Sequence, residues 1–287
     1  MQRYKILHRT YYNFSDPVKP GPHVLLLRPR ESYELRIESF KLDITPAASV
    51  KWHRDVEDNS VAVAVFDSVA SQIVFESETV IQQYQQTPLD FLVADYAINY
   101  PFDYSRDDLS ILTPYLEKQG DSSHREGVKE WVASLWQTGE KIQTYALLDR
   151  LNRDIRQNFV YQIREEPGVQ SPAKTTSLRS GSCRDFATLL MAAAQHLGMA
   201  ARFVSGYLNT PPSITDLGAT HAWAEIYIPG AGWKGFDPTN GEVVGGNHIA
   251  VAVARLPESV PPVSGSYVGN AGSTLDVGVW VTELTWP

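Results

Sequence analysis

The strongest local signal in this chain is a helix start that carries its single cysteine. Ser182 and Asp185 have the Ser-x-x-Asp spacing of a capping box, and the residues that follow are rich in Ala, Leu and Met. Apolar residues recur there at spacings of three and four, which predicts a helix with one buried face that ends before Gly198. Cys183 then occupies the first helical position.

This position favours a reactive thiol. Free backbone N–H groups and the helix dipole stabilise an anion at a helix N-terminus by roughly 0.3–1 kcal/mol, or about 2 kcal/mol when the group is partly buried. Arg184 adds positive charge, and thiols in such settings ionise at about pH 3.5–7.5 instead of about pH 8.5. A lone cysteine is otherwise most often a small buried residue, so Cys183 indicates chemistry only together with suitable partners.

Two later segments supply such partners. Residues 221–228 alternate between apolar and polar side chains, 229–232 form a turn cluster, and 233–237 return as a second strand. We therefore predict a β-hairpin. His221 lies at its start on the face opposite the apolar one, where a cleft can reach it.

The register of this hairpin decides whether His221 meets Asp237. With a symmetric loop at 229–232, Asp237 faces Ala224, so contact with His221 requires a bulge or a longer loop. Taken separately, His221 is explained as a strand residue whose polar atoms are hydrogen-bonded, and the Asp-Pro pair is explained as the start of a turn. Together with Cys183, in the order Cys, His, Asp, they indicate a thiol acyl-transfer site.

Four ordered blocks of the sequence resemble the bacterial transglutaminase-like family. They are residues 181–186, 202–207, 220–223 and 232–240. Two N-terminal stretches, 8–18 and 25–30, also resemble the β-rich N-terminal domain of that family. The resemblance implies an α+β protein with a papain-like transglutaminase core, in which the helix that bears the cysteine packs on an antiparallel sheet that bears His and Asp.

The same resemblance implies a division of labour. Cys183 is the nucleophile that forms a thioester, His221 is the general base and then acid, and Asp237 orients the imidazole. The backbone N–H of Cys183 is one natural oxyanion donor. Tyr161 and Gln170 lie upstream, where related enzymes recruit a second donor, and both are candidates.

Four further side chains are candidates for the lining of the cleft. Two of them are Arg184, directly after the nucleophile, and Tyr207, in the second block. The others are Trp223 and Trp233, each of which is equally well explained by packing within the hairpin. The seven histidines show neither His-Glu-x-x-His spacing nor paired cysteines, so we expect no metal site and no cofactor.

The sequence departs from animal-type cross-linking transglutaminases at one informative position. Those enzymes carry tryptophan after the nucleophile, whereas Arg184 stands here. This departure favours hydrolysis of an amide or isopeptide bond in a peptide or protein over amine transfer to a protein glutamine. A non-catalytic protein with the papain-like fold, acting in binding or as a scaffold, is the second class of function, and an intact charged triad argues against it.

The pattern of the chain predicts four regions. Residues 1–90 alternate as strands and predict an antiparallel, sandwich-like domain. Residues 91–125 are turn-rich and predict a connector, and 126–255 form the core. Residues 256–287 predict an extension with a closing strand near 275–281.

Composition limits the partners. The net charge of −8 argues against binding to nucleic acid or to an anionic membrane, and no apolar run is long enough to span a bilayer. The start of the chain alternates like a strand and lacks the apolar core of a signal peptide. A single reactive thiol is most easily kept reduced in the cytoplasm, which is the compartment we expect. The oligomeric state is left open.

Overall fold

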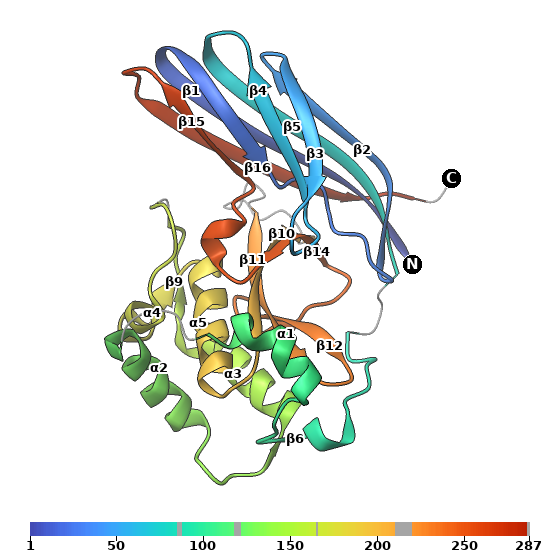
Figure 1. Ribbon diagram of the computed structural model, residues 1–287, viewed down its shortest axis with the longest axis vertical. Coiled ribbons are helices and arrows are strands. Elements are labelled where there is room, and N and C mark those ends of the chain that lie inside the picture. The colour runs from blue at the N-terminus through green and yellow to red at the C-terminus, as the bar shows by residue number, and fades with distance from the viewer. Residues whose placement is uncertain (85–87, 118–121, 165, 210–219, 286–287) are drawn as a thin grey trace.

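A long N-terminal strand organises the first part of the molecule. The computed structural model describes residues 1–84, 88–117, 122–164, 166–209 and 220–285. Strand β1 (Gln2–Leu25) pairs along its first half with β5 (Ala70–Gln83) and β16 (Ser273–Glu283). Its last part pairs with β4 (Ser60–Phe66) and β15 (Val263–Val268). One strand therefore runs through both layers of this sheet (Figure 1).

Two more strands complete the sheet. β2 (Leu35–Thr45) pairs with β5, and β3 (Ala48–Arg54) pairs with β4, which gives the order β2-β5-β1-β4-β3, all antiparallel. The sheet folds around its own apolar core, which includes Phe14, Val18, Leu25, Ile73 and Phe75. The predicted antiparallel, sandwich-like domain is confirmed, in the form of a sheet that is almost a barrel.

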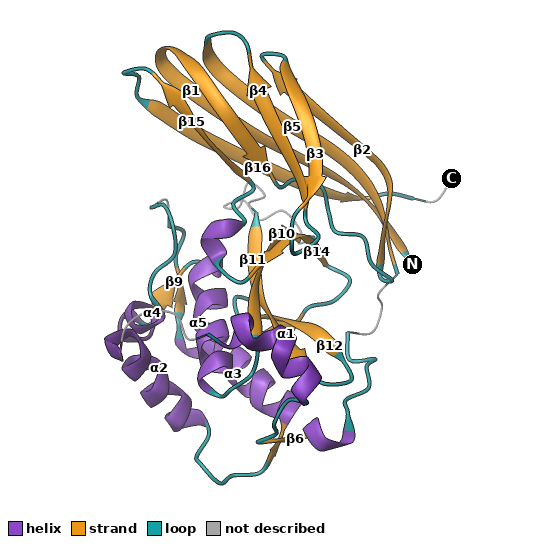
Figure 2. Ribbon diagram, in the orientation of Figure 1, coloured by secondary structure: helices purple, strands orange, loops and turns teal. Residues whose placement is uncertain are grey.

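Helices form one side of the second part of the molecule. Figure 2 shows them in purple below the N-terminal sheet. In chain order the elements are η1 (Asp95–Ala97), β6 (Asn99–Tyr100), α1 (Arg106–Leu116), α2 (Ser122–Leu135), β7 (Ile142–Gln143), α3 (Thr144–Asn158), β8 (Val160–Tyr161), α4 (Pro172–Leu178), β9 (Ser180–Gly181) and α5 (Cys183–His196).

A five-stranded antiparallel sheet forms the other side. Its order is β13 (Glu242–Val243), β12 (Gly232–Asp237), β11 (His221–Ile228), β10 (Ala201–Leu208) and β14 (His248–Ala254). The buried face of α5, with Phe186, Leu189 and Leu190, shares one apolar core with Ala224 and Ile226 of β11. The helix that bears the cysteine thus packs on the sheet that bears His and Asp, as predicted. A short 3-10 helix, η2 (Pro257–Ser259), follows β14.

The two parts are joined through the outer edge of β14. Asn59 donates from Nδ2 to the carbonyl of Val253 (2.8 Å) and accepts the backbone N–H of Val253 on Oδ1 (2.9 Å). The backbone N–H of Arg30 donates to the carbonyl of Ala250 (2.8 Å). An edge strand normally exposes such groups to solvent. Here the N-terminal domain satisfies them, so the two domains share a continuous interface.

The last strands of the chain return to the N-terminal sheet. The strand expected near residues 275–281 is β16, and it pairs with β1 over Tyr4↔Glu283 to Phe14↔Ser273. The segment predicted to be an extension therefore completes the first domain. Within the described residues no helix has the length and apolar character needed to cross a membrane.

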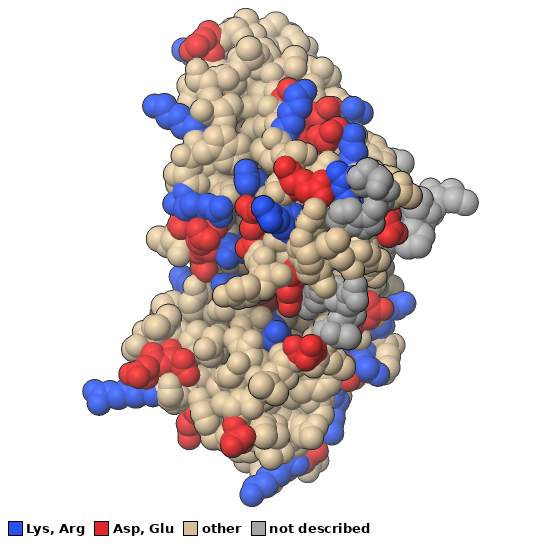
Figure 3. All heavy atoms as spheres, turned by 90° about the vertical axis from the view of Figure 1, so that its right-hand side faces the viewer, with Lys and Arg blue, Asp and Glu red and all other residues tan. Residues whose placement is uncertain are grey.

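Several charged side chains on the outer faces form ion pairs. Lys5 pairs with Glu78 (2.7 Å) and Lys41 with Asp43 (2.6 Å). On the face shown in Figure 3, acidic and basic side chains of the described residues are interspersed over both domains. Neither sign dominates that face.

Candidate active site

The start of α5 is fixed by its capping residues. The backbone N–H and the hydroxyl of Ser182 both donate to Oδ2 of Asp185, each at 2.8 Å. The predicted capping box is therefore formed, and the prediction that the helix begins at Cys183 is confirmed. Gly198, just past the helix end, adopts a φ of 78°, as expected for a residue in the left-handed region.

Asp185 also ties the preceding loop to the helix. Its carboxylate accepts the backbone N–H of Gln170 (2.7 Å) and Nη1 of Arg164 (2.8 Å). Burial opposes ionisation, but these hydrogen bonds outweigh it and lower the pKa of Asp185. Arg184 donates to the backbone carbonyls of Arg164 (3.0 Å) and Glu166 (2.5 Å) in the same loop.

The register of the β11–β12 hairpin differs from the one assumed. Ile228 pairs with Gly232 and Ala224 with Phe236, so the loop contains only residues 229–231. Continuing this register places Asp237 opposite Trp223, on the same face as His221. The prediction that contact requires a bulge or a longer loop is wrong. A loop one residue shorter moves the carboxylate to the correct face, because side chains alternate along a strand.

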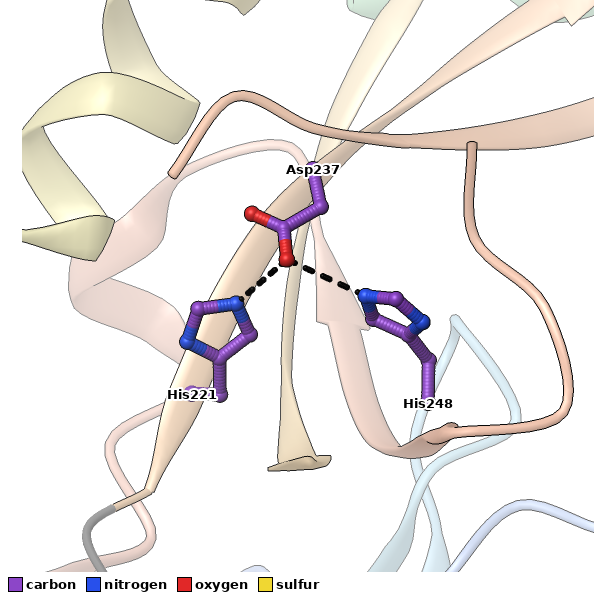
Figure 4. A group of neighbouring side chains, drawn as sticks. All are labelled: His221, Asp237 and His248. Carbon is purple, nitrogen blue, oxygen red and sulfur yellow. Dashed lines mark hydrogen bonds and ion pairs between the residues drawn. The ribbon is translucent and has the colours of Figure 1, made fainter. Parts of the chain in front are cut away.

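The hairpin and the helix bring the three predicted side chains together. His221 Nε2 lies 2.8 Å from Asp237 Oδ2, and the side chain of His221 also hydrogen-bonds to Cys183. Since Nε2 is engaged by the carboxylate, Nδ1 is the nitrogen that faces the sulfur. Figure 4 shows the two ring nitrogens on opposite edges of the imidazole. Cys183 itself is half-buried.

The charges of the site support one another. Burial lowers the pKa of His221, but hydrogen bonds to Asp237 and Cys183 outweigh it and raise the pKa to about 10. Burial likewise opposes ionisation of Asp237, yet donors from His221 and His248 hold its pKa well below the usual range. At neutral pH the site therefore contains an imidazolium between a carboxylate and the cysteine sulfur.

His248 is a member of this cluster that sequence reasoning missed. Its Nε2 lies 3.1 Å from the same oxygen of Asp237 that His221 contacts (Figure 4). From the sequence it is only one of several scattered histidines. Its position at the first residue of a strand, shortly after the Asp-Pro block, was the available signal.

The three side chains of Figure 4 raise the question of a metal. Their ligand atoms lie within 4.8 Å of one another. However, Nδ1 of His248 accepts the backbone N–H of Gly245 (3.4 Å), which leaves the ring proton on Nε2, the nitrogen that faces Asp237. A protonated ring nitrogen donates a hydrogen bond and cannot bind a cation. The hydrogen bonds therefore favour a proton-linked cluster.

A groove opens beside the sulfur. It has a volume of about 290 Å³ and is bordered by Cys183, Arg184 and His221. Its walls are mainly apolar, with Val169 from the loop before the helix, Phe203 and Ala222 from the sheet, and Val260, Pro261 and Pro262 from the segment after β14. The nucleophile and its base thus face a space bounded by side chains from several elements.

Only one of the four candidate lining residues reaches this groove. Arg184 lines it, whereas Tyr207 is 2% exposed and its hydroxyl bonds Nδ1 of His8 at the domain interface (3.0 Å). Trp223 is 1% exposed and packs edge-on against His248. Trp233 lies under the guanidinium of Arg202, 4.3 Å from its ring centre. These three residues serve packing, so their assignment to the cleft was wrong.

The three candidate oxyanion donors differ in whether they offer a hydrogen-bond donor to the groove. The backbone N–H of Cys183 is at the first helical position, where no carbonyl four residues earlier in the helix can accept it. Gln170 does not offer a donor, because Nε2 already donates to the carbonyl of Ser180 (3.1 Å) and to Asp185 (3.3 Å). Tyr161 pairs with Gly181 through β8 and β9 but is exposed and does not border the described groove.

Gly206 lies directly opposite His221 in the β10–β11 pair and leaves room for a tryptophan. A Cβ at this position would lie 2.4 Å from the carbonyl oxygen of Ile249 and 2.5 Å from the ring of Trp223. We expect Gly206→Ala to lower the free energy of unfolding by about 1–3 kcal/mol, because a well-packed core resists added volume. Urea denaturation measures this change.

The matched control is Gly272→Ala. No heavy atom lies within 4 Å of a Cβ at that glycine, so its effect should stay within about 0.5 kcal/mol. Equal stability losses in the two variants would show that crowding around Trp223 is not the cause.

Comparison with known proteins adds a family context to this geometry. Residues 4–82 match the bacterial transglutaminase-like N-terminal region, and residues 131–238 match the core of the transglutaminase-like superfamily. An uncharacterized protein of Mycobacterium tuberculosis is 28% identical over 98% of this chain and 93% of its own length. An uncharacterized protein of Mycobacterium leprae is 36% identical over 36% of this chain and 38% of its own length.

A solved structure has the same overall fold. The crystal structure of a Cytophaga hutchinsonii protein, described as "a Putative Cysteine Protease", aligns with a TM-score of 0.73 and 20% identity. The alignment covers 100% of this chain and 92% of that one. The likeness therefore extends over both domains.

Proposed function

Because this chain joins a bacterial transglutaminase-like N-terminal region to a transglutaminase-like core, we propose that it is a cysteine-dependent enzyme that cleaves an amide bond of a peptide or protein. The observation that carries this proposal is the hydrogen-bonded row of Cys183, His221 and Asp237 beside an open groove. A protein used only for binding has no need to bury a carboxylate against a protonated imidazole.

The first half of the reaction follows from the positions of these groups. The thiolate of Cys183 attacks the amide carbon, and a carbon–sulfur bond forms as the carbonyl becomes an oxyanion. The backbone N–H of Cys183 is placed to donate to that oxygen. The imidazolium of His221 then gives its Nδ1 proton to the departing amine, and the carbon–nitrogen bond breaks. A thioester and a neutral imidazole remain.

The second half reverses the role of His221. The neutral imidazole removes a proton from an incoming water molecule, whose oxygen attacks the thioester, and the thiolate leaves. Asp237 keeps Nε2 protonated in both halves, so Nδ1 is always the nitrogen that transfers the proton. The product on the acyl side is a carboxylate.

We favour water over an amine as the acceptor. The nucleophile is followed by Arg184, whose guanidinium lines the groove and donates to two carbonyls of the loop beside it. This replaces the tryptophan of cross-linking enzymes by a polar group, and transfer to an amine depends on how well a site excludes water. Amine transfer to a protein glutamine is the alternative.

The groove supports a peptide as the substrate. Its apolar walls, formed by Phe203, Val260 and the two prolines Pro261 and Pro262, suit an extended chain with an apolar residue next to the scissile bond. A reducing compartment keeps the sole thiol active, so the cytoplasm remains our proposed location.

Alkylation of Cys183 by iodoacetamide tests whether His221 activates the thiol. We expect alkylation at pH 7 to be about tenfold faster or more in the native protein than in His221→Ala, because an ordinary thiol is only a few per cent ionised at that pH. Intact-protein mass measures it, since no other cysteine competes.

His53→Ala is the matched control, since His53 is an exposed histidine on β3. Its alkylation profile should equal that of the native protein. Alkylation that is slow at pH 7 in the native protein, or unchanged by His221→Ala, contradicts the proposed activation of the thiol.

A further inference from the structure

Asp237 accepts hydrogen bonds from two histidines on the same oxygen. His221 Nε2 and His248 Nε2 lie 2.8 and 3.1 Å from Oδ2, and Figure 4 shows their rings on either side of the carboxylate. The proposed reaction uses only the first of these contacts. His248 therefore makes a buried contact with Asp237 to which the proposed reaction assigns no role.

The proton of His248 can be located from its other ring nitrogen. Nδ1 accepts the backbone N–H of Gly245, so the proton lies on Nε2 and points to Asp237. The side chain is 2% exposed, and its ring meets that of Trp223 edge-on, with centroids 5.3 Å apart. Packing and hydrogen bonds together leave this imidazole one orientation.

We propose that His248 is a positioning residue, which holds Oδ2 of Asp237 from the side opposite His221 and draws part of the carboxylate charge away from the base. This inference rests on the proposed function, because it concerns how strongly His221 retains the proton that it must give to the leaving amine. A base that binds its proton too tightly is a poor acid. Catalysis by one group in both roles is fastest when it accepts and donates the proton with similar ease.

The surroundings of His248 limit which groups affect it. On the sheet it faces Asp237 and, beyond it, His221, whose ring centre is 6.3 Å away. On the other side it borders a cavity of about 500 Å³ that Glu242 and the N-terminal Met1 also line. Asp237 is the titratable group that His248 contacts directly, so the carboxylate of Asp237 transmits the effect of His248 to His221.

Donors other than His248 also hold the carboxylate of Asp237. Its other oxygen, Oδ1, accepts the backbone N–H of Thr239 (2.9 Å) and of Asn240 (3.4 Å), and Nδ2 of Asn240 donates to Oδ2 (3.0 Å). Loss of the donor at His248 therefore concentrates negative charge on an oxygen that still faces His221. The proton of His221 is then held more strongly.

Two variants separate this effect from simple packing. His248→Phe keeps a ring but removes the donor, whereas His248→Gln keeps an N–H near the position of Nε2. We expect the pKa of His221 to rise by about one unit in His248→Phe, since one unit is the size of a single hydrogen bond to a charged group. In His248→Gln it should stay within about 0.3 units of the native value. Nitrogen-15 NMR of the histidine rings of the full chain measures both.

The same spectra contain an internal check that needs no variant. The native protein should show His248 protonated on Nε2 and unprotonated on Nδ1 at neutral pH, and the opposite tautomer overturns the proposal even if a variant fails to fold. An unchanged or lowered pKa of His221 in His248→Phe also overturns it, as does an equal shift in both variants.

Failure of the role proposed for His248 can be distinguished from failure of the proposed enzymatic function. The NMR titration requires no substrate, so a shift in His221 without peptide cleavage leaves the positioning role intact and removes the enzymatic one. Cleavage that depends on Cys183, combined with an unshifted His221 in His248→Phe, removes only the role of His248.

Discussion

Replacing Cys183 with alanine should abolish peptide cleavage, with a loss in rate on the order of 10⁶, because the members of a triad act as a unit and none works without the nucleophile. The sulfur is the only atom of the site that can form the thioester. Incubation with a peptide library, followed by mass spectrometry, measures the loss. The same assay with a dansylated amine separates the two acceptors, since the acyl product gains water in hydrolysis and the dansylated amine in transfer, in each case with loss of the departing amine.

The control for this variant is structural integrity. Cys183 is half-buried at a helix start and packs against the core without being one of its fully buried members, so Cys183→Ala should keep the circular dichroism spectrum and unfold within a few degrees of the native protein. Cleavage that survives in a folded Cys183→Ala protein shows that another group performs the chemistry.

Replacing Asp237 with asparagine should have the second largest effect. Papain-like enzymes tolerate asparagine at the orienting position, but this site does not offer the conditions for it. Every partner of the carboxylate is a donor: two imidazoles, two backbone N–H groups and one side-chain amide. An NH₂ group in either orientation faces donors and finds no acceptor. We expect a fall in cleavage of about 10⁴, as when the corresponding acid of a serine triad becomes an amide.

The same variant should lose stability in a pH-dependent way. Asp237 has a lowered pKa in the folded protein, so its carboxylate contributes fully above its ordinary pKa of about 3.9 and the contribution fades as the pH falls further. The stability difference between native protein and Asp237→Asn should therefore be largest between about pH 4 and pH 6.5 and shrink below about pH 4. It should also decline from about pH 6.5 toward pH 10, because the stability that comes from the raised pKa of His221 is lost as His221 deprotonates. Urea denaturation at several pH values measures it, and a difference that grows in acid contradicts the assignment.

Asp67→Asn is a useful comparison for charge alone. Asp67 is exposed in the bend after β4, so the same charge change there should leave cleavage unchanged. A loss of activity in both variants would indicate sensitivity to net charge and not to the buried carboxylate.

The helix start and the direction of His221 were predictable from the sequence because they depend on local rules. A Ser-x-x-Asp cap fixes where a helix begins, and alternation along residues 221–228 fixes which way His221 points. The hairpin register was not predictable in the same way. The sequence fits a loop of residues 229–231 as well as a loop of residues 229–232. The choice between them moves Asp237 from one face of its strand to the other.

The lining of the groove depends on the tertiary arrangement. Tyr207 and Trp223 lie on strands next to the site, but strand alternation does not reveal which face of a two-sided sheet meets the cleft. Tyr207 packs against the N-terminal domain, and Trp223 fills the space left by Gly206. His248 was missed because a separate strand pair, β10 with β14, carries it to Asp237.

The pairing of β1 with β16 has a consequence for biosynthesis. Tyr4 and Glu283 are 279 positions apart in the sequence, yet they are neighbours in one sheet. During translation β1 can pair with β5 early. Its other side pairs with β16, which is made only after the helices and the five-stranded sheet of the second domain. Contacts so distant along a polypeptide slow folding. One side of β1 therefore stays unpaired in the nascent chain until β16 has been made, and the pairing of β16 closes this side of the sheet.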